Sequence, residues 1–252
     1  IFVNDQVQSK GKLNNINISK EAIRLNQQGL KQLLFGQIKN AINLFEKSIK
    51  TDGQFSDPYF NLGNIYIQKN DFVKSESLYE KAVGLNNKNP DYFFNLAVAK
   101  SNLNKIHDAI DHYKKTLELE PDNAKAFKFL GNCLKDLKNF NEAIKVYNSW
   151  ESLEPNNPEP VFSKSLIHIR NGRFDLGWNL YEAGLNNNIR EPFDDFYNET
   201  KNIWDGVPYD GTLLVYGEQG LGDQILFGTI LPELLKDQKK IILKVDKRLK
   251  NL

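Results

Sequence analysis

Three columns of similar residues recur every 34 positions along most of this chain. The first column consists of small residues: Ala41, Ser75, Ala109, Ala143 and Gly177. Four positions after each of them stands an aromatic residue: Phe45, Tyr79, Tyr113, Tyr147 and Tyr181. The other two columns are Gly29, Gly63, Ala97, Gly131 and Ser165, and Ile38, Phe72, Ile106, Phe140 and Phe174. Composition alone does not produce five copies in one register, so the chain is expected to fold as a repeat.

A 34-residue period with this content is typical of the tetratricopeptide repeat, in which two helices joined by a turn stack on the next pair. The sequence therefore predicts a mostly α fold, a tetratricopeptide α-solenoid over residues 19–189 that follows a polar tail at 1–18. About five repeats are expected, at 22–55, 56–89, 90–123, 124–157 and 158–189. Gln28 and Lys164 replace, in the first and fifth repeats, the leucine that precedes the small residue of the first helix elsewhere.

The concave face of such a solenoid is lined by the first helices and serves as a binding surface. One column on these helices consists of Gln27, Asn61, Asn95, Phe129 and Ser163. Side-chain amides donate and accept hydrogen bonds together, so they can hold an extended backbone without reading its sequence. We therefore expect a peptide or protein partner on the concave face, bound by Gln27, Asn61 and Asn95. Asparagine is also common at this position in such repeats, which leaves a purely structural role open, and Phe129 interrupts the column.

Charge and cysteine content argue against several other classes of partner. The chain has 33 Lys and Arg against 32 Asp and Glu, so no net field favours nucleic acid. No run of residues approaches the ~20 apolar positions that a membrane span requires. The single Cys133 cannot form an internal disulfide, and the first residues do not read as a secretory signal. Together these features predict a cytoplasmic protein.

A different pattern follows the repeats and an expected linker at 190–211. Thr212–Tyr216 and Ile241–Val245 are short runs of β-forming residues and predict two buried strands. Asp223–Leu235 carries apolar residues at helical spacing. Residues 212–252 therefore predict the opening β-α-β piece of a Rossmann-like α/β domain. Two parallel strands do not form a stable sheet alone, so we expect this domain to be incomplete within the chain.

The loop after the first expected strand, Gly217–Asp223, is rich in glycine. Glycines at a strand-to-helix turn let the backbone approach a ligand, and the N–H groups at a helix start favour anions. Gly220 and Gly222 have the spacing of a dinucleotide-binding fingerprint, with Asp246 as the ribose-binding acid. Ile225 occupies the third glycine position, which disfavours that interpretation.

The stretch LLVYGEQGLGDQILF (Leu213–Phe227), with Trp204-Asp205-Gly206 and Gly177-Trp178 before it, resembles a known arrangement. It is similar to bacterial tetratricopeptide proteins whose C-terminal domain is a GT-B glycosyltransferase, related to the heptosyltransferases and the O-linked N-acetylglucosamine transferases. The column with Asn61 and Asn95 also resembles the start of the asparagine ladder of the latter group. The resemblance implies a nucleotide-sugar donor for the full-length protein, with none bound by this chain, which lacks the donor half.

The resemblance also implies roles for the glycine-rich loop. Asp223 matches the residue that acts as catalytic base in heptosyltransferase-like members, where it removes the acceptor proton; capping of the following helix is an equally open role. Glu218, Gln219, Gly220 and Gly222 match the acceptor loop. No metal is expected, because the three histidines lack ligand spacing. The implied function is the protein-binding arm of a glycosyltransferase acting on a hydroxyl or amide, inactive in isolation. The alternative is a non-catalytic adaptor.

Overall fold

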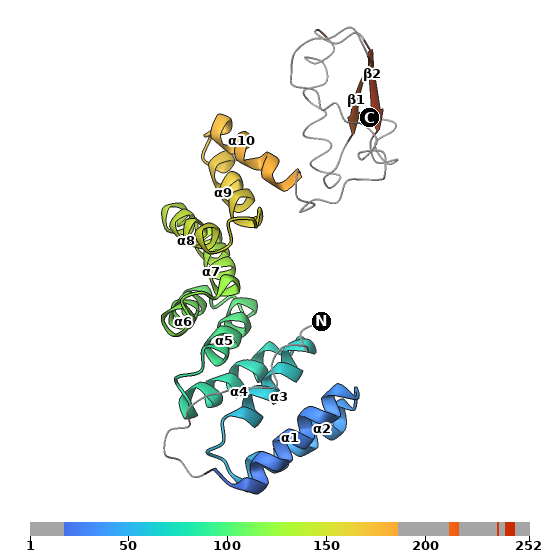
Figure 1. Ribbon diagram of the computed structural model, residues 1–252, viewed down its shortest axis with the longest axis vertical. Helices are drawn as coiled ribbons and strands as arrows, with labels where there is room; N and C mark the ends of the chain where they lie inside the picture. The colour runs from blue at the N-terminus through green and yellow to red at the C-terminus, as the bar shows by residue number, and fades with distance from the viewer. Residues whose placement is uncertain (1–17, 186–211, 217–235, 237–239, 245–252) are drawn as a thin grey trace. The chain divides into compact units, whose positions relative to one another are not determined.

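The computed structural model describes residues 18–185, 212–216, 236 and 240–244. The chain divides into two compact units, Ile1–Gly177 and Trp178–Leu252, with the boundary inside the last helix. Ten helices follow one another within 18–185 (Figure 1). Their bounds are α1 Lys20–Leu34, α2 Ile38–Thr51, α3 Asp57–Gln68, α4 Phe72–Leu85, α5 Pro90–Asn102, α6 Ile106–Leu119, α7 Ala124–Asp136, α8 Phe140–Leu153, α9 Glu159–Arg170 and α10 Phe174–Leu185.

The helices of the first unit pack as successive pairs. The odd-numbered helix of each pair contacts the even-numbered helix that follows it, and each even-numbered helix contacts the next pair, from α2 on α3 to α8 on α9. Among the first helices, α3 also contacts both α1 and α5. The predicted helix–turn–helix repeats are therefore confirmed, and the first helix begins at Lys20, directly after Ser19.

The small residues of the first helices leave room for an aromatic ring from the second helix of the same repeat. A Cβ atom at Gly131 would lie 2.3 Å from Cε1 of Tyr147, and one at Gly63 would lie 2.5 Å from the same atom of Tyr79. Real Cβ atoms do not approach a ring so closely, so these glycines let the two helices of a repeat meet. Two of the columns seen in the sequence are therefore the two sides of one contact.

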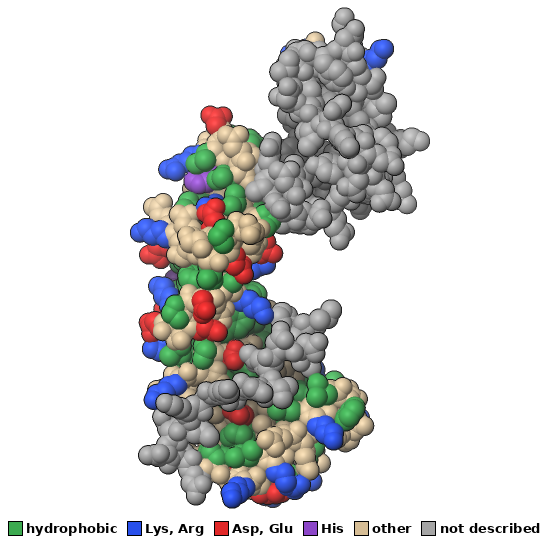
Figure 2. Space-filling view, viewed as in Figure 1, with side chains coloured by type: hydrophobic (Ala, Val, Ile, Leu, Met, Phe, Trp, Pro, Cys, Tyr) green, Lys and Arg blue, Asp and Glu red, His purple; other side chains and the backbone are tan. Residues whose placement is uncertain are grey.

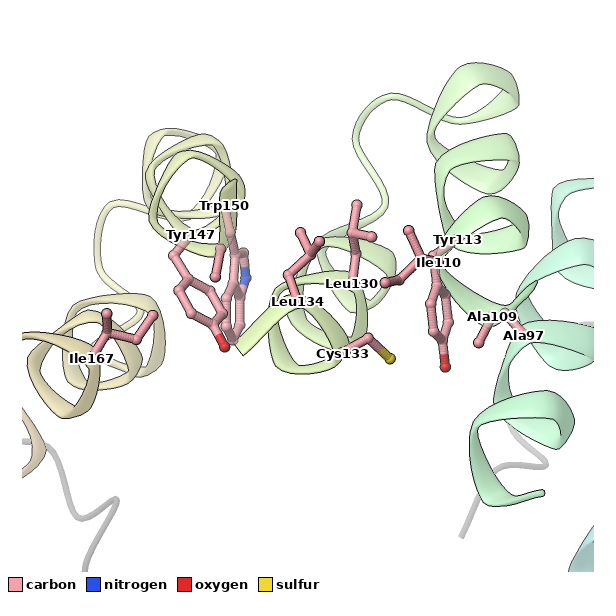
Figure 3. Close-up of a cluster of buried hydrophobic side chains, with 11 residues drawn as sticks. Ala97, Ala109, Ile110, Tyr113, Leu130, Cys133, Leu134, Tyr147, Trp150 and Ile167 are labelled. Carbon is pink, nitrogen blue, oxygen red and sulfur yellow. The ribbon is translucent and has the colours of Figure 1, made fainter. Parts of the chain in front are cut away.

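The largest hydrophobic cluster extends through the third, fourth and fifth repeats (Figure 3). Tyr113 and Tyr147 are fully buried in it, and Trp150 is 2% exposed. Trp150 replaces a small residue of the second helix, and its ring centroid lies 6.4 Å from that of Tyr147. The core is thus a continuous row of contacts between neighbouring repeats, as expected for a solenoid.

Gln28 and Lys164, which replace the leucine of the first helix in the first and fifth repeats, differ in burial and contacts. Leu62, Leu96 and Leu130 are each at most 4% exposed where a first helix packs on the preceding repeat. Gln28 at the corresponding position of α1 is exposed. Lys164 on α9 is 12% exposed at its side chain, and its Nζ contacts Oε2 of Glu151 at 2.5 Å and Oδ1 of Asn148 at 2.9 Å on α8. An ion pair therefore stands in the α8–α9 junction where the earlier junctions have leucine.

The turn inside each repeat has one residue in the left-handed backbone region. These residues also form a 34-residue column: Gly36, Asn70, Asn104, Lys138 and Gly172, with φ between 58° and 73°. Glycine and asparagine adopt this conformation readily, whereas other side chains are strained there. Lys138 is therefore the poorly suited member of the column.

We expect Lys138→Gly to raise the free energy of unfolding by about 1 kcal/mol, because the substitution removes the steric cost of a Cβ atom at positive φ. Urea denaturation followed by circular dichroism measures the change. Lys138→Ala is the matched control: it removes the long side chain but keeps the Cβ atom, and should change stability little. Equal effects of the two substitutions would contradict the explanation.

In the second unit, β1 (Thr212–Tyr216) and β2 (Lys240–Lys244) pair in parallel, with Leu213 opposite Ile241 and Val215 opposite Leu243. The second strand begins one residue earlier than the sequence predicts. The helix expected at Asp223–Leu235 lies outside the described residues, so the β-α-β piece stays a prediction. None of the described helices is long and apolar enough to cross a membrane.

Candidate functional site

The predicted binding column lies on successive first helices, but its members differ in exposure. Gln27 on α1 is exposed, and Asn95 on α5 is half-buried. Asn61 on α3 is only 9% exposed, whereas Phe129 on α7 is 38% exposed. The structure thus places these residues at equivalent positions without making them equally available to a ligand.

Asn61 belongs to the contact between the first two repeats. Its Nδ2 donates to Oδ1 of Asn26 on α1 at 2.9 Å, and Asn26 is 4% exposed. Removing one partner of a buried amide pair costs about 1–3 kcal/mol, so Asn61 has a structural role whatever it binds. The sequence column did not reveal this partner, because Asn26 precedes the column position occupied by Gln27.

Asn95 has a simpler environment. Its Nδ2 donates to the backbone oxygen of Asp91 one turn earlier, at 3.0 Å. Among the hydrogen bonds of the described residues, none uses the Oδ1 atom of Asn95. The side-chain carbonyl can therefore accept a hydrogen bond from the N–H group of a bound backbone.

A second pair of asparagines on the first helices was missed by the sequence reasoning. Asn64 accepts from the hydroxyl of Tyr79 at 2.7 Å, and Asn132 accepts from the hydroxyl of Tyr147 at 2.8 Å. Burial raises the pKa of both tyrosines above the ordinary value, so both hydroxyls stay protonated and donate. The available signal was the repetition of Asn64 three residues after Asn61 and of Asn132 three residues after Phe129. These amides anchor the second helix of their own repeat.

Aromatic rings accompany the amide column one position earlier on the same helices. The ring centroid of Phe60 lies 4.8 Å from that of Tyr92. Phe94 meets Phe129 edge-on at 5.7 Å, and Phe129 stacks on the buried Tyr113 at 5.9 Å with 16° between the planes. We call the set Phe60, Asn61, Phe94, Asn95 and Phe129 the first-helix face. Figure 2 shows hydrophobic side chains reaching the surface among charged ones along the helical unit.

Ionised groups are scarce on the helices that carry most of this face. The only charged residue of α3 is Asp57, which accepts a hydrogen bond from Tyr92. α5 carries Asp91 and Lys100, and Lys100 is buried. The first-helix face is therefore built from amides and aromatic rings.

The buried charges lie instead between α4, α5 and α6. Nζ of Lys100 contacts Glu76 at 2.9 Å and Glu80 at 3.0 Å, and Nζ of Lys105 contacts Glu76 at 2.7 Å. Burial acts to raise the pKa of Glu76, but the hydrogen bonds from Lys105 and Lys100 outweigh it and hold that pKa below its ordinary value. Burial likewise acts to lower the pKa of Lys100, and its two glutamates hold it above the ordinary value. This network joins two repeats.

Cys133 and His168 are buried within the packing of the helical unit. Cys133 is buried beside the Ser101 hydroxyl, and burial raises the pKa of its thiol. Burial, aided by Arg173 and Lys164, lowers the pKa of His168. Across the described parts of the chain, no three His, Cys, Asp or Glu side chains gather in a way that could hold a metal ion.

The loop residues implied by the family resemblance are Glu218, Gln219, Gly220, Gly222 and Asp223. All of them lie outside the described residues. Their roles as acceptor loop and catalytic base remain predictions.

Family comparisons match two segments of the helical unit. Residues 56–89, which contain α3 and α4, and residues 102–163 both match models described as tetratricopeptide repeat. These segments are therefore tetratricopeptide repeats, in agreement with the period of the sequence. Among curated proteins, none matches the sequence.

Several solved structures share the fold. A crystal structure of MamA is similar with a TM-score of 0.63 and 20% identity, over 66% of this chain and 91% of that chain. MamA from Desulfovibrio magneticus RS-1 gives 0.62 and 11% identity, over 67% and 96%. YrrB, described as a TPR protein with an unusual peptide-binding site, gives 0.61 and 17% identity, over 66% and 85%. At these identities the similarity establishes the fold of the repeats.

Proposed function

We propose that the first-helix face binds a segment of another protein in an extended conformation. The observation that carries the proposal is Asn95, a half-buried residue on a first helix whose side-chain carbonyl accepts no hydrogen bond within the described residues. Successive repeats repeat such positions along a line, which suits a linear ligand. The fold of the repeats is similar to that of YrrB, which is described as having an unusual peptide-binding site, and this similarity supports the same function.

The test begins with random 12-residue peptides displayed on phage and selected on the intact 252-residue chain. Synthetic versions of the selected peptides are then titrated with the protein, and fluorescence anisotropy gives the Kd. Asn95→Ala should weaken binding about five- to tenfold, the equivalent of one hydrogen bond of about 1–1.5 kcal/mol.

Asn40→Ala is the matched control, because Asn40 is an exposed asparagine on α2 that bonds only to Gln32 and Gln37 among the described residues. It should leave the Kd unchanged. Asn61→Ala is a poor probe, since it also removes the partner of buried Asn26. Failure to select any peptide, or equal effects at positions 40 and 95, would count against the proposal.

We further propose that the repeats serve as the protein-binding arm of a glycosyltransferase that uses a nucleotide-sugar donor. The support is the Glu218–Asp223 sequence directly after β1, together with the parallel pairing of β1 and β2. In this proposal Asp223 removes the proton of the acceptor hydroxyl. A non-catalytic adaptor is the alternative, and it accounts for the repeats equally well.

A turnover assay separates these two functions. The protein would be incubated with a panel of UDP-, GDP- and ADP-sugars, with release of the nucleoside diphosphate measured in the presence of a selected peptide. Turnover that Asp223→Asn reduces by about 10²–10⁴-fold supports the transferase. Peptide binding without turnover supports the adaptor.

A further inference from the structure

Phe129 interrupts the polar column of the first helices and places a partly exposed aromatic ring where the other repeats have an amide or a hydroxyl. The ring is 38% exposed although it packs against two other rings, the fully buried Tyr113 and the half-buried Phe94. Two aromatic neighbours hold it in place. Binding an apolar group to such a ring therefore costs little side-chain entropy, which is typical of the residues that dominate binding energy in interfaces.

Several charges on the helices that carry the first-helix face are already engaged. Asp57 accepts a hydrogen bond from Tyr92, and Lys100 is buried against Glu76 and Glu80. Lys128, next to Phe129, pairs with Glu159 and lies over the Trp150 ring, with 5.9 Å from its Nζ to the centroid. α7 also carries Lys125, Lys135 and Asp136, and Nζ of Lys135 donates to Asn132. The part of the first-helix face on α3 and α5 therefore offers a strongly charged ligand few complementary groups.

We infer that the first-helix face is specific for an uncharged peptide segment that carries an aromatic or large aliphatic side chain, bound against Phe129. The inference rests on the proposed function and names the ligand class. Asn95 binds the backbone of the segment, while Phe129 and Phe94 contact its apolar side chain. Neighbouring helix axes are about 8–10 Å apart, and an extended chain advances about 3.3 Å per residue. The apolar side chain should therefore lie about three residues from the backbone group held by Asn95.

The selected phage peptides test the inference through their composition and their response to salt. We expect them to have little net charge and to share a Phe, Trp, Tyr or Leu position. Their Kd should change less than about twofold between 50 and 500 mM NaCl, because screening weakens only interactions between charges. Peptides dominated by acidic or by basic residues, with affinity that falls steeply with salt, would overturn the inference and leave the proposed function standing. Selection of no peptide at all would instead contradict the proposed function.

Substitutions at Phe129 locate the binding site on the intact chain. Phe129→Ser should weaken binding of the selected peptides at least about tenfold, and Phe129→Trp should retain it, because an aromatic ring remains available. Leu153→Ser is the matched control: Leu153 is also 38% exposed but lies at the end of α8, a second helix. Thermal unfolding of each variant shows whether it remains folded. Equal losses for Phe129→Ser and Leu153→Ser, or no loss for either, would overturn the assignment to this face.

Discussion

Tyr147→Ala is expected to lower the free energy of unfolding by about 3–5 kcal/mol, the range found when a buried aromatic side chain is truncated. The Tyr147 ring is fully buried, lies against Gly131 and belongs to the cluster that joins three repeats. Alanine would leave a cavity that the rigid helix pair cannot close. Urea denaturation followed by circular dichroism at neutral pH measures the loss.

Tyr147→Phe is the control for that substitution. It keeps the ring in place and removes only the hydroxyl, which donates to Oδ1 of Asn132 at 2.8 Å. We expect a loss of about 1 kcal/mol, the typical net contribution of one hydrogen bond. If phenylalanine proved as harmful as alanine, the hydrogen bond rather than the packing of the ring would dominate at this position.

Glu76→Ala is expected to cost about 3 kcal/mol, because it leaves Lys100 buried without its closest partner. The side chains of Lys100 and Glu76 are each 9% exposed. The loss should fall at the low end of the range for broken buried pairs, since Glu80 remains 3.0 Å from the Lys100 Nζ atom. A cost below about 1 kcal/mol, the contribution of a surface pair, would contradict this description of the network.

Replacing both charges tests whether the loss comes from the unpaired cation. The double variant Glu76→Met, Lys100→Met removes both buried charges and should be close to the natural protein in stability.

The network of Glu76 with Lys100 and Lys105 also predicts that stability depends on pH. Because the pKa of Glu76 is lowered in the folded protein, its contribution is present at neutral pH and is lost as the pH falls below about 4.3, the ordinary range of glutamate. Glu76→Met should reduce that acid sensitivity.

The period of 34 residues was sufficient to predict the helical repeats, because each repeat must place the same small and aromatic residues at the same contact. The same period also marks a further column, in the turn inside each repeat. The turn column that includes Asn70 and Lys138 has the same period, and its glycines and asparagines are a recognisable signal for positive φ. The residues that differ between repeats were less predictable.

Side-chain partners across repeats could not be read from the columns. The contact of Asn61 with Asn26, and the pairing of Lys100 with Glu76, join residues whose proximity depends on how one repeat rotates on the next. The break at Phe129 was visible in the sequence, but its exposure depends on Phe94 and Tyr113. The loop at Glu218–Asp223 belongs to a part of the chain whose proposed chemistry still depends on sequence resemblance.

The ion pair of Lys164 with Glu151 makes the α8–α9 junction respond to salt differently from the earlier junctions. The earlier junctions depend on buried leucines, whose contribution increases in solutions that strengthen the hydrophobic effect. A pair of charges that is partly accessible to water weakens as salt is added. The α8–α9 junction also buries Ile167 against the core that contains Tyr147 and Trp150, so solutes act on it through two opposing contributions. At high concentrations of a strongly hydrated salt, this junction should therefore gain less stability than the earlier junctions, which have leucine in place of the ion pair.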